Sequence, residues 1–188
     1  VVKYRNLKLD KGNKATGWTP APEDTQLEID KSTYNPVRYI RDWANGSTAN
    51  TSNHWYEIQA IDTLGNNIAL GKTVRSNDST SLFPVVTDGN TAGTYATGGT
   101  NMKGYMEVDL GSVYYNISEI KVWRYHNDGR TYYDTKTEVS EDGNNWYPIF
   151  DSKIENEYSE TSAGRTFPNT QAKAEGLLAA YHTTERLE

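Results

Sequence analysis

Residues 105–150, YMEVDLGSVYYNISEIKVWRYHNDGRTYYDTKTEVSEDGNNWYPIF, decide the fold of this chain. Apolar residues alternate with acidic ones in Met106–Leu110, and a second alternation runs through Ile120–Arg124. Further strand-like runs follow at Lys136–Ser140 and, after an Asp-Gly turn, at Trp146–Phe150. Alternation with a period of two residues, closed by Gly-Ser and Asp-Gly turns, predicts an antiparallel sheet.

The segments on either side extend this all-β pattern. Val37–Trp43 and His54–Asp62 carry the β-branched and aromatic residues that are typical of strands. Residues 77–104 consist mainly of turn-forming residues, so we expect them to wrap one end of the structure. Residues 152–168 are expected to supply a last edge strand. The sequence therefore predicts a β-sandwich.

Composition excludes several classes of function. The chain has 188 residues, of which 35% are hydrophobic and 12% aromatic, so its core must rely on aromatic side chains. A formal net charge of −6 argues against a nucleic acid or an anionic membrane surface as partner. The absence of cysteine rules out disulfides and thiolate chemistry. The chain also lacks the Gly-x-Ser-x-Gly and His-Glu-x-x-His motifs, and we do not expect an enzyme.

The sequence motifs of the central stretch resemble those of a known family. "VDLGS" at 108–112, "I..IKVW" at 117–123 and "TEVSEDGNNW" at 137–146 are similar, in this order and spacing, to the coagulation-factor C-type (discoidin) domain and the related family 32 carbohydrate-binding modules. The resemblance implies a galactose-binding-like jelly-roll β-sandwich. It also implies a module that binds carbohydrate and carries out no catalysis.

The order of the segments differs from the order in that family. "VRYIR" at 37–41 and "EIQA" at 57–60 resemble the pair that closes the family's domain, whereas "NIALGKTVRS" at 67–76 resembles the segment that opens it. We interpret this as a circular permutation, which costs little where native termini lie close together. The early strands should then pair with strands from the later half of the chain.

Three regions are expected along the chain. Residues 1–24 are interpreted as a remnant strand and linker of a preceding module, in which Pro20 and Pro22 should prevent regular structure. Within this region, "RNLKLDKGNKATGWTPAPED" resembles the closing strand and exit linker of modules in tail proteins of phages of Gram-positive bacteria. Residues 25–168 form the discoidin-like domain, which begins with a polar lead-in at 25–36. Residues 169–188 form a C-terminal helical appendage that ends in a Leu-Glu pair typical of a cloning scar.

The aromatic and polar loop between two predicted strands is the first candidate site. Loops on a rigid sheet often carry binding residues, and sugars need flat aromatic rings together with several hydrogen-bonding groups. The loop supplies the rings of Tyr125, Tyr132 and Tyr133 and the polar groups of His126, Asp128 and Arg130. Adjoining loops add Asn53, His54 and Asn101, with Asn50, Tyr95 and Tyr105 as further candidates.

A second candidate site would hold a metal. In the resembled family a turn of the type "DGN" binds a cation together with a Glu at the start of the closing strand. The corresponding residues here are Asp88, Asn90 and Glu57, whose oxygens suit structural Ca²⁺. The family's next ligand, a Thr, has no clear counterpart near Gly93 and Thr94. In the alternative interpretation, Asp88 only caps its turn and Glu57 faces solvent.

The resemblances together imply a non-catalytic carbohydrate-binding module of a phage or prophage tail protein. Its ligand would be a host cell-wall polysaccharide or another glycan, its other partners would be tail-protein subunits, and its location would be extracellular, on the virion tail. Two alternatives stay open. One is a substrate-targeting module of a glycoside hydrolase, and the other is a structural spacer domain of a tail fibre that binds no ligand.

Overall fold

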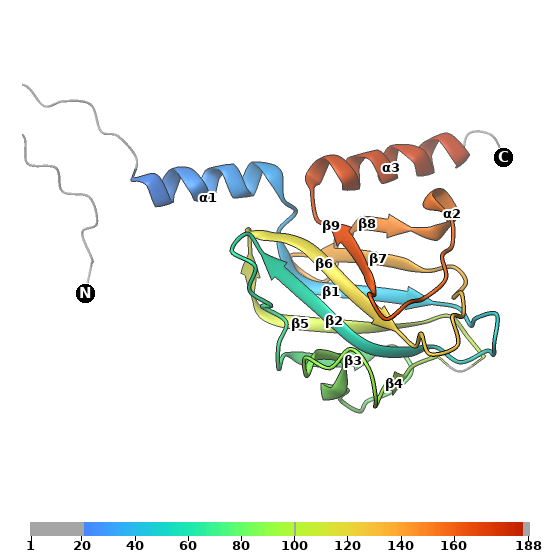
Figure 1. Ribbon diagram of the computed structural model, residues 1–188. Helices are drawn as coiled ribbons and strands as arrows, with labels where there is room; N and C mark the ends of the chain where they lie inside the picture. The colour runs from blue at the N-terminus through green and yellow to red at the C-terminus, as the bar shows by residue number, and fades with distance from the viewer. Residues whose placement is uncertain (1–20, 100, 186–188) are drawn as a thin grey trace, which may run out of the picture.

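Two antiparallel sheets pack face to face in the computed structural model, which describes residues 21–99 and 101–185 (Figure 1). The expected remnant strand within residues 1–20 lies outside the described residues. The larger sheet has the strand order β3 (Thr73–Ser76), β5 (Gly104–Tyr114), β1 (Val37–Ala44), β7 (Lys136–Ser140) and β8 (Tyr147–Asp151). The smaller sheet has the order β4 (Ala96–Thr97), β2 (His54–Asp62), β6 (Ile117–Arg124) and β9 (Arg165–Pro168). The predicted all-β sandwich is confirmed.

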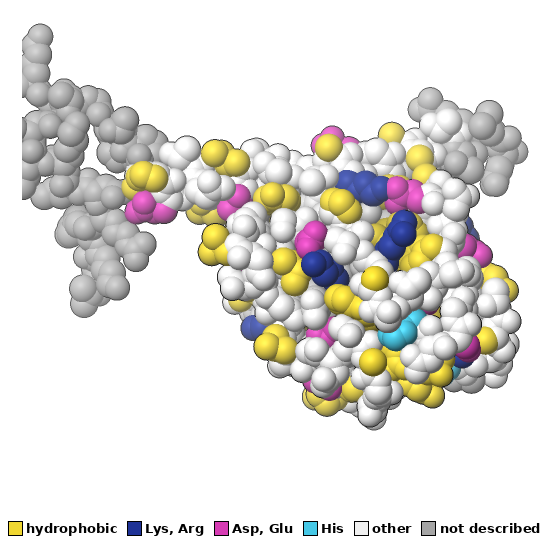
Figure 2. Space-filling model, in the orientation of Figure 1, with side chains coloured by type: hydrophobic (Ala, Val, Ile, Leu, Met, Phe, Trp, Pro, Cys, Tyr) yellow, Lys and Arg dark blue, Asp and Glu magenta, His cyan; other side chains and the backbone are white. Residues whose placement is uncertain are grey.

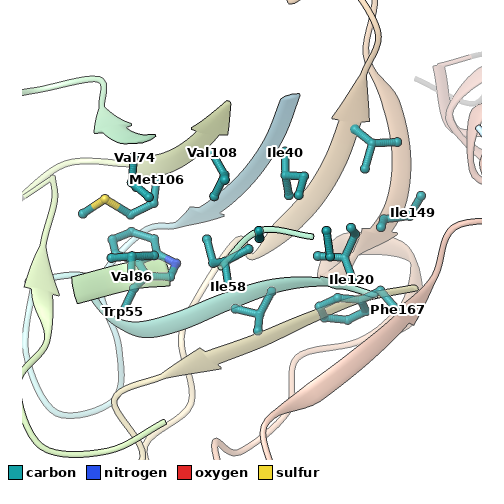
Figure 3. Close-up of a cluster of buried hydrophobic side chains, with 14 of the residues drawn as sticks. Ile40, Trp55, Ile58, Val74, Val86, Met106, Val108, Ile120, Ile149 and Phe167 are labelled. Atoms are coloured by element: carbon teal, nitrogen blue, oxygen red, sulfur yellow. The ribbon is translucent and has the colours of Figure 1, made fainter. Parts of the chain in front are cut away.

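The alternation in the central stretch determines which side chains enter the core. Met106, Val108 and Leu110 of β5 are at most 1% exposed, whereas Glu107 and Asp109 between them are partly exposed. The core fills the space between the two sheets (Figure 3). Burial of this apolar surface, at roughly 25 cal/mol per Å², is the main force that holds the sheets together.

The two early strands pair with later ones, as predicted. β1 lies between β5 and β7, with Ile40 opposite Val108 on one side and opposite Val139 on the other. β2 pairs with β6, where Ile58 lies opposite Val122. Residues 37–62 are thus divided between the two sheets and form no separate unit.

The loop-rich segment and the last edge strand also agree broadly with the predictions from the sequence. Between β3 and β5 the described residues form a short 3-10 helix, η1 (Pro84–Thr87), and the two-residue strand β4. β9 pairs with β6 alone and is the predicted last edge strand. Asp151 caps the four-residue helix α2 (Ser152–Glu155), because its Oδ1 accepts a hydrogen bond from the backbone N–H of Lys153 at 2.9 Å.

Residues Pro22–Thr33 form helix α1. The prediction of an irregular linker followed by a polar lead-in is therefore wrong for this segment. Proline has no N–H to donate, and the first turn of a helix needs none from it, so Pro22 starts the helix instead of preventing it. Glu23 and Asp24 place negative charge in the first turn, where the helix dipole favours it. α1 therefore crosses the predicted boundary between residues 24 and 25. It projects beyond the sandwich, and Asp30 is its one buried residue (Figure 1).

Helix α3 (Gln171–Glu185) is the predicted C-terminal helix, and it packs against β8. Ala174 and Leu177 are at most 4% exposed, and the hydroxyl of Tyr181 donates to Asp151 Oδ2 at 2.6 Å. Within the described part of the chain, no helix combines the length and apolar character needed to cross a membrane.

A buried ionic cluster joins the two sheets. Arg124 of β6 is fully buried, and its guanidinium donates to both carboxylate oxygens of Asp42 on β1, at 2.6 and 2.9 Å. The same guanidinium donates to Glu160 at 3.0 Å and to the hydroxyl of Tyr158 at 2.7 Å. Trp55 Nε1 adds a bond to Asp42 Oδ2 at 2.6 Å. These charges tolerate burial because each one faces opposite charge or a hydrogen-bonding group.

A pair of asparagines joins the points where the chain enters and leaves the sandwich. Asn35 Nδ2 donates to Asn169 Oδ1 at 3.0 Å, and Asn169 Nδ2 donates to the backbone oxygen of Asn35 at 3.0 Å. Both residues are at most 2% exposed. The backbone N–H of Asn35 also donates to the backbone oxygen of Asn169 at 3.3 Å. We call this contact the asparagine clasp.

Candidate functional site

Three loops meet at the end of the sandwich where β1 stops and β2 begins. Residues 45–53, 98–99 with 101–103, and 125–135 are joined there by backbone hydrogen bonds. The Tyr133 N–H donates to the Gly46 oxygen at 3.0 Å, and the Tyr133 oxygen accepts from Asn45 N–H at 2.9 Å. The Asn101 N–H donates to the Thr51 oxygen at 3.1 Å. Loops held in this way present their side chains in fixed positions.

A hollow of about 230 Å³ lies between these loops. Tyr133 is 40% exposed and Met102 is 50% exposed, so both offer apolar surface to a ligand. The lining residues are Asn45, Gly46, Ser47, Asn50, Thr51, Asn101, Met102 and Tyr133. We call this hollow the loop-end pocket. All of its lining residues are uncharged, and a pocket of this chemistry suits a small neutral ligand with hydroxyl groups.

An aromatic patch lies beside the pocket, on the outer face of the smaller sheet. Tyr125 stacks on Tyr56 with ring centroids 5.6 Å apart, and Tyr95 meets Tyr125 edge to face at 5.3 Å. His54 and His126 contact the same rings, at 4.7 Å from Tyr95 and 5.1 Å from Tyr56. On this face, Figure 2 shows a histidine side chain at the surface with hydrophobic side chains close to it. Tyr95 is 40% exposed, so the patch is accessible at its edge.

The polar groups of the predicted loop are engaged within the protein. Arg130 is 8% exposed and donates to both carboxylate oxygens of Asp128, at 2.9 and 2.6 Å. This bidentate pairing holds the pKa of Asp128 below its ordinary value. Burial, followed by the positive charge of Arg130, lowers the pKa of His54, which is therefore neutral at pH 7. His126 Nε2 lies 3.0 Å from the backbone oxygen of Thr91.

Besides Arg130, two further predicted binding residues are buried and cannot present their side chains to a ligand. Tyr132 is 1% exposed and belongs to the core, because its strand-like bridge to Ser47 turns the ring inward. Asn53 is fully buried, and its amide links the backbone of Gly46 to that of Gly99 and Met102. The prediction that Tyr132 and Asn53 contact a ligand is therefore wrong. Both side chains support the loops instead.

The other predicted residues divide between the two surfaces. Tyr133 and Asn101, with the further candidate Asn50, line the loop-end pocket, whereas Tyr125, His126 and His54 belong to the aromatic patch. Tyr105 lies apart on the outer face of the larger sheet, between Trp43 and the guanidinium of Arg41. The sequence reasoning missed Asn45, Ser47, Thr51 and Met102. The turn-forming run Asn45-Gly46-Ser47 was the only local signal for any of them.

Of the residues predicted to hold a metal, Glu57 contacts the backbone of the turn that carries Asp88 and Asn90. Glu57 Oε1 accepts a hydrogen bond from the backbone N–H of Gly89 at 3.2 Å, which places it at the Asp88–Asn90 turn. Asp88 Oδ1 accepts from the Asn90 N–H at 2.8 Å, as expected for a capped turn. Glu57 is fully buried, so the expectation that it could face solvent is wrong. Its Oε2 has no hydrogen-bond partner among the described residues.

The electrostatics of Glu57 are unusual for a carboxyl group. Burial raises its pKa to about 7, and the nearby charge of Asp88 adds to the effect. A buried carboxylate with an unpartnered oxygen beside a second carboxylate is poorly compensated by the protein alone. No group of three or more imidazole, thiol or carboxylate side chains converges in residues 21–99 and 101–185. Any cation here would need amide, backbone or water oxygens to complete its shell.

Comparison with known proteins supports the discoidin-like fold. Residues 85–174 match the family described as NedA-like, galactose-binding domain. The match begins in η1, includes the strands from β4 to β9, and covers the loop 125–135 of the candidate site. No curated protein and no solved structure matches the chain significantly.

Proposed function

We propose that this chain is a non-catalytic carbohydrate-binding domain and that the loop-end pocket is its binding site. The observation that carries the proposal is the pocket itself, in which exposed Tyr133 stands beside the amides of Asn50 and Asn101. Sugar rings have apolar C–H faces that pack on an aromatic ring, and hydroxyl groups that pair with amides. The match to a galactose-binding family supports the same ligand class.

Binding at one such pocket is expected to be weak. The pocket is small, and its hydrogen bonds compete with those that the sugar makes to water. We expect dissociation constants on the order of millimolar to micromolar. Useful adhesion would then depend on several copies of the domain acting together, because linked weak sites gain avidity.

The test is a titration of the domain with purified cell-wall polysaccharide and with a glycan array. Tyr133→Ala and Asn101→Ala should weaken binding by about tenfold or more, because each removes a ligand contact from the exposed wall of the pocket. Tyr95→Ala in the aromatic patch is the matched control and should bind like wild type. If Tyr95→Ala alone loses binding, the site is the aromatic patch. If the wild type binds no glycan, the structural-spacer alternative is favoured.

The proposal includes a structural Ca²⁺ held by Glu57, Asp88 and Asn90. Its support is the buried and unpartnered Glu57 Oε2, which a cation would satisfy. The ion would link β2 to the loop after η1 and would supply positive charge against two carboxylates. Because binding to the native state adds stability, excess chelator should lower the melting temperature and added Ca²⁺ should restore it. Glu57→Gln should abolish this response, and an unchanged melting temperature in wild type would refute the site.

The biological setting belongs to the proposal as well. The resemblance of residues 5–24 to tail-protein linkers favours a phage or prophage tail protein, extracellular on the virion and bound to other tail subunits. The permuted order of a discoidin-like domain is part of the same proposal, and it is supported by the resemblance of 37–60 to the family's closing pair and of 67–76 to its opening segment. Pull-down of tail subunits by the full-length parent protein would test the setting. An adjoining hydrolase domain would instead support the substrate-targeting alternative.

A further inference from the structure

The amide side chains of the loop-end pocket are each fixed at one end. Asn45 Nδ2 donates to Asp134 Oδ2 at 2.8 Å. Since a carboxylate can only accept, the amide orientation of Asn45 is settled and its Oδ1 is left as an acceptor. Asn50 Oδ1 accepts from the backbone N–H of Ser52 at 3.0 Å. Since a backbone N–H can only donate, the Nδ2 of Asn50 is left as a donor.

These two groups make a defined pair of unused hydrogen-bonding positions. Among the described residues, neither Asn45 Oδ1 nor Asn50 Nδ2 has a hydrogen-bond partner in the protein. Both residues line the pocket, and Asn101, which also lines it, accepts a hydrogen bond from the Thr51 hydroxyl through its Oδ1 at 2.5 Å. The pocket thus offers one fixed acceptor and one fixed donor at its wall.

The same pocket has an apolar side. Met102 is 50% exposed and Tyr133 is 40% exposed, although both are large apolar side chains. Exposed methionine adapts its shape to a small apolar group, and burying such a group removes apolar surface from water. No lining residue is charged, so nothing in the pocket wall would compensate a charged ligand.

We infer that the loop-end pocket selects 2-acetamido sugars over plain hexoses, an inference that rests on the carbohydrate-binding function proposed above. An acetamido group combines an N–H donor, a carbonyl acceptor and a methyl group. The N–H would pair with Asn45 Oδ1, the carbonyl with Asn50 Nδ2, and the methyl with Met102. A hydroxyl at the same position leaves the methionine surface uncovered. An ammonium group would direct its own donors at the donor of Asn50, and the lining offers it no carboxylate. The nearby carboxylate of Asp134 is already engaged by Asn45 and Lys153.

The experiment compares monosaccharides by ligand-observed NMR and calorimetry. N-acetylglucosamine and N-acetylgalactosamine are titrated beside glucose, galactose and glucosamine. Two hydrogen bonds and one buried methyl group should give the acetamido sugars an advantage of about tenfold or more. Asn50→Asp keeps the bond to Ser52 but replaces the donor with an acceptor, and Met102→Ala removes the apolar contact. Each variant should reduce the advantage to about threefold or less.

Matched controls make the same Asn→Asp change, and a similar truncation of an exposed apolar side chain, at the opposite end of the sandwich. Asn116→Asp and Leu64→Ala alter a turn asparagine and a leucine that is 82% exposed, and both should retain the full advantage. Melting curves establish that every variant is folded. Equal binding of acetamido sugars and hexoses, with both lost in Tyr133→Ala, would overturn the inference and leave the proposed function intact. A preference that survives Asn50→Asp and Met102→Ala would also overturn it. Failure of every sugar and polysaccharide to bind wild type would overturn both.

Discussion

At the scale of single residues, the core contains an arginine at a position of β6 where the alternation predicts an apolar side chain. Arg124 follows Ile120 and Val122 on the inward face of β6, and its charge is balanced by Asp42 and Glu160. The sequence showed that this position points inward, but it could not show the partners. Asp42 and Glu160 are distant along the chain, and only the folded sheets bring them to Arg124.

Arg124→Met should lower the free energy of unfolding by about 3–5 kcal/mol, because it leaves two carboxylates buried without their cation. The matched control is Arg165→Met, which removes an exposed guanidinium that lies 4.8 Å from the ring of Tyr158. The control should cost less than about 1 kcal/mol. Urea unfolding curves with equal slopes measure both changes. Similar losses in the two variants would show that the cluster contributes little.

Asp142 gives a prediction about pH. The backbone amides of Asn145 and Asn144 donate to its Oδ1 at 2.8 Å each, and they lower its pKa to about 2. A carboxyl whose pKa is depressed by folding stabilises the protein above its unfolded pKa, near 3.9, and loses that effect as pH falls toward 2. Asp142→Asn should therefore melt below wild type at pH 7, with a difference that shrinks below pH 4. NMR titration of the carboxyl should place its midpoint near 2, and a midpoint near 4 would contradict this account.

Tyr132 and Tyr133 show where reasoning about the candidate site reached its limit. The two residues are adjacent, have the same side chain and occupy the same loop, yet Tyr132 is 1% exposed and Tyr133 is 40% exposed. Their difference follows from the pairing of Tyr132 with Ser47, a contact between loops that are far apart in sequence. Local patterns identified the right loop, but they could not identify which of its rings faces a ligand.

At the scale of elements, strands were more predictable than helices. Residues 106–110 of β5 alternate strictly, so their faces could be assigned from the sequence alone, whereas β7 and β8 were recognised as strands without an alternation that assigns their faces. Helix α1 has no clear apolar stripe, and its prolines suggested irregular structure until Pro22 was found in the first turn. The loop-end pocket was least predictable, because its lining comes from three loops whose backbones meet only after the sheets have formed.

The docking of α3 gives a prediction at this scale, and two neighbouring leucines provide it with an internal control. Leu177 is 4% exposed, whereas Leu178 is 38% exposed. Leu177→Ala should lower the free energy of unfolding by about 2–3 kcal/mol, and Leu178→Ala by less than about 1 kcal/mol. In a domain of this size the first change corresponds to a fall of roughly 4–12 °C in melting temperature. Equal effects would mean that α3 is not docked as described.

At the scale of the whole molecule, the strand pairing agrees with the order predicted from the resembled family. β1 and β2 precede the rest of the sandwich in sequence but occupy interior positions in the two sheets. Both sheets therefore need these two strands, whatever their place in the order of the chain. The proposal that the chain is a permuted discoidin-like domain can therefore be tested by restoring the other order.

A reordered chain should fold into the same sandwich. It would run from Gly65 to Glu185, continue through a Gly/Ser linker of about 15 residues, and end with residues 35–64. Such a linker can return along the roughly 22 Å length of α3, which starts beside the asparagine clasp. The opening lies next to Leu64, which is 82% exposed in its turn. Circular dichroism and cooperative melting close to those of residues 21–185 are expected, and a chain without cooperative melting would argue against the permutation.

The asparagine clasp also determines how the domain is attached to its surroundings. Asn35 and Asn169 hold the incoming and outgoing chain together at one corner, whereas the loop-end pocket lies where β1 ends, at the far end of the strands. A tether that pulls on both flanking segments therefore acts at a single corner, and the pocket is directed away from the anchor. Mechanical load would reach the clasp before it reached the loops that surround a ligand. A domain under tension would therefore keep its ligand bound.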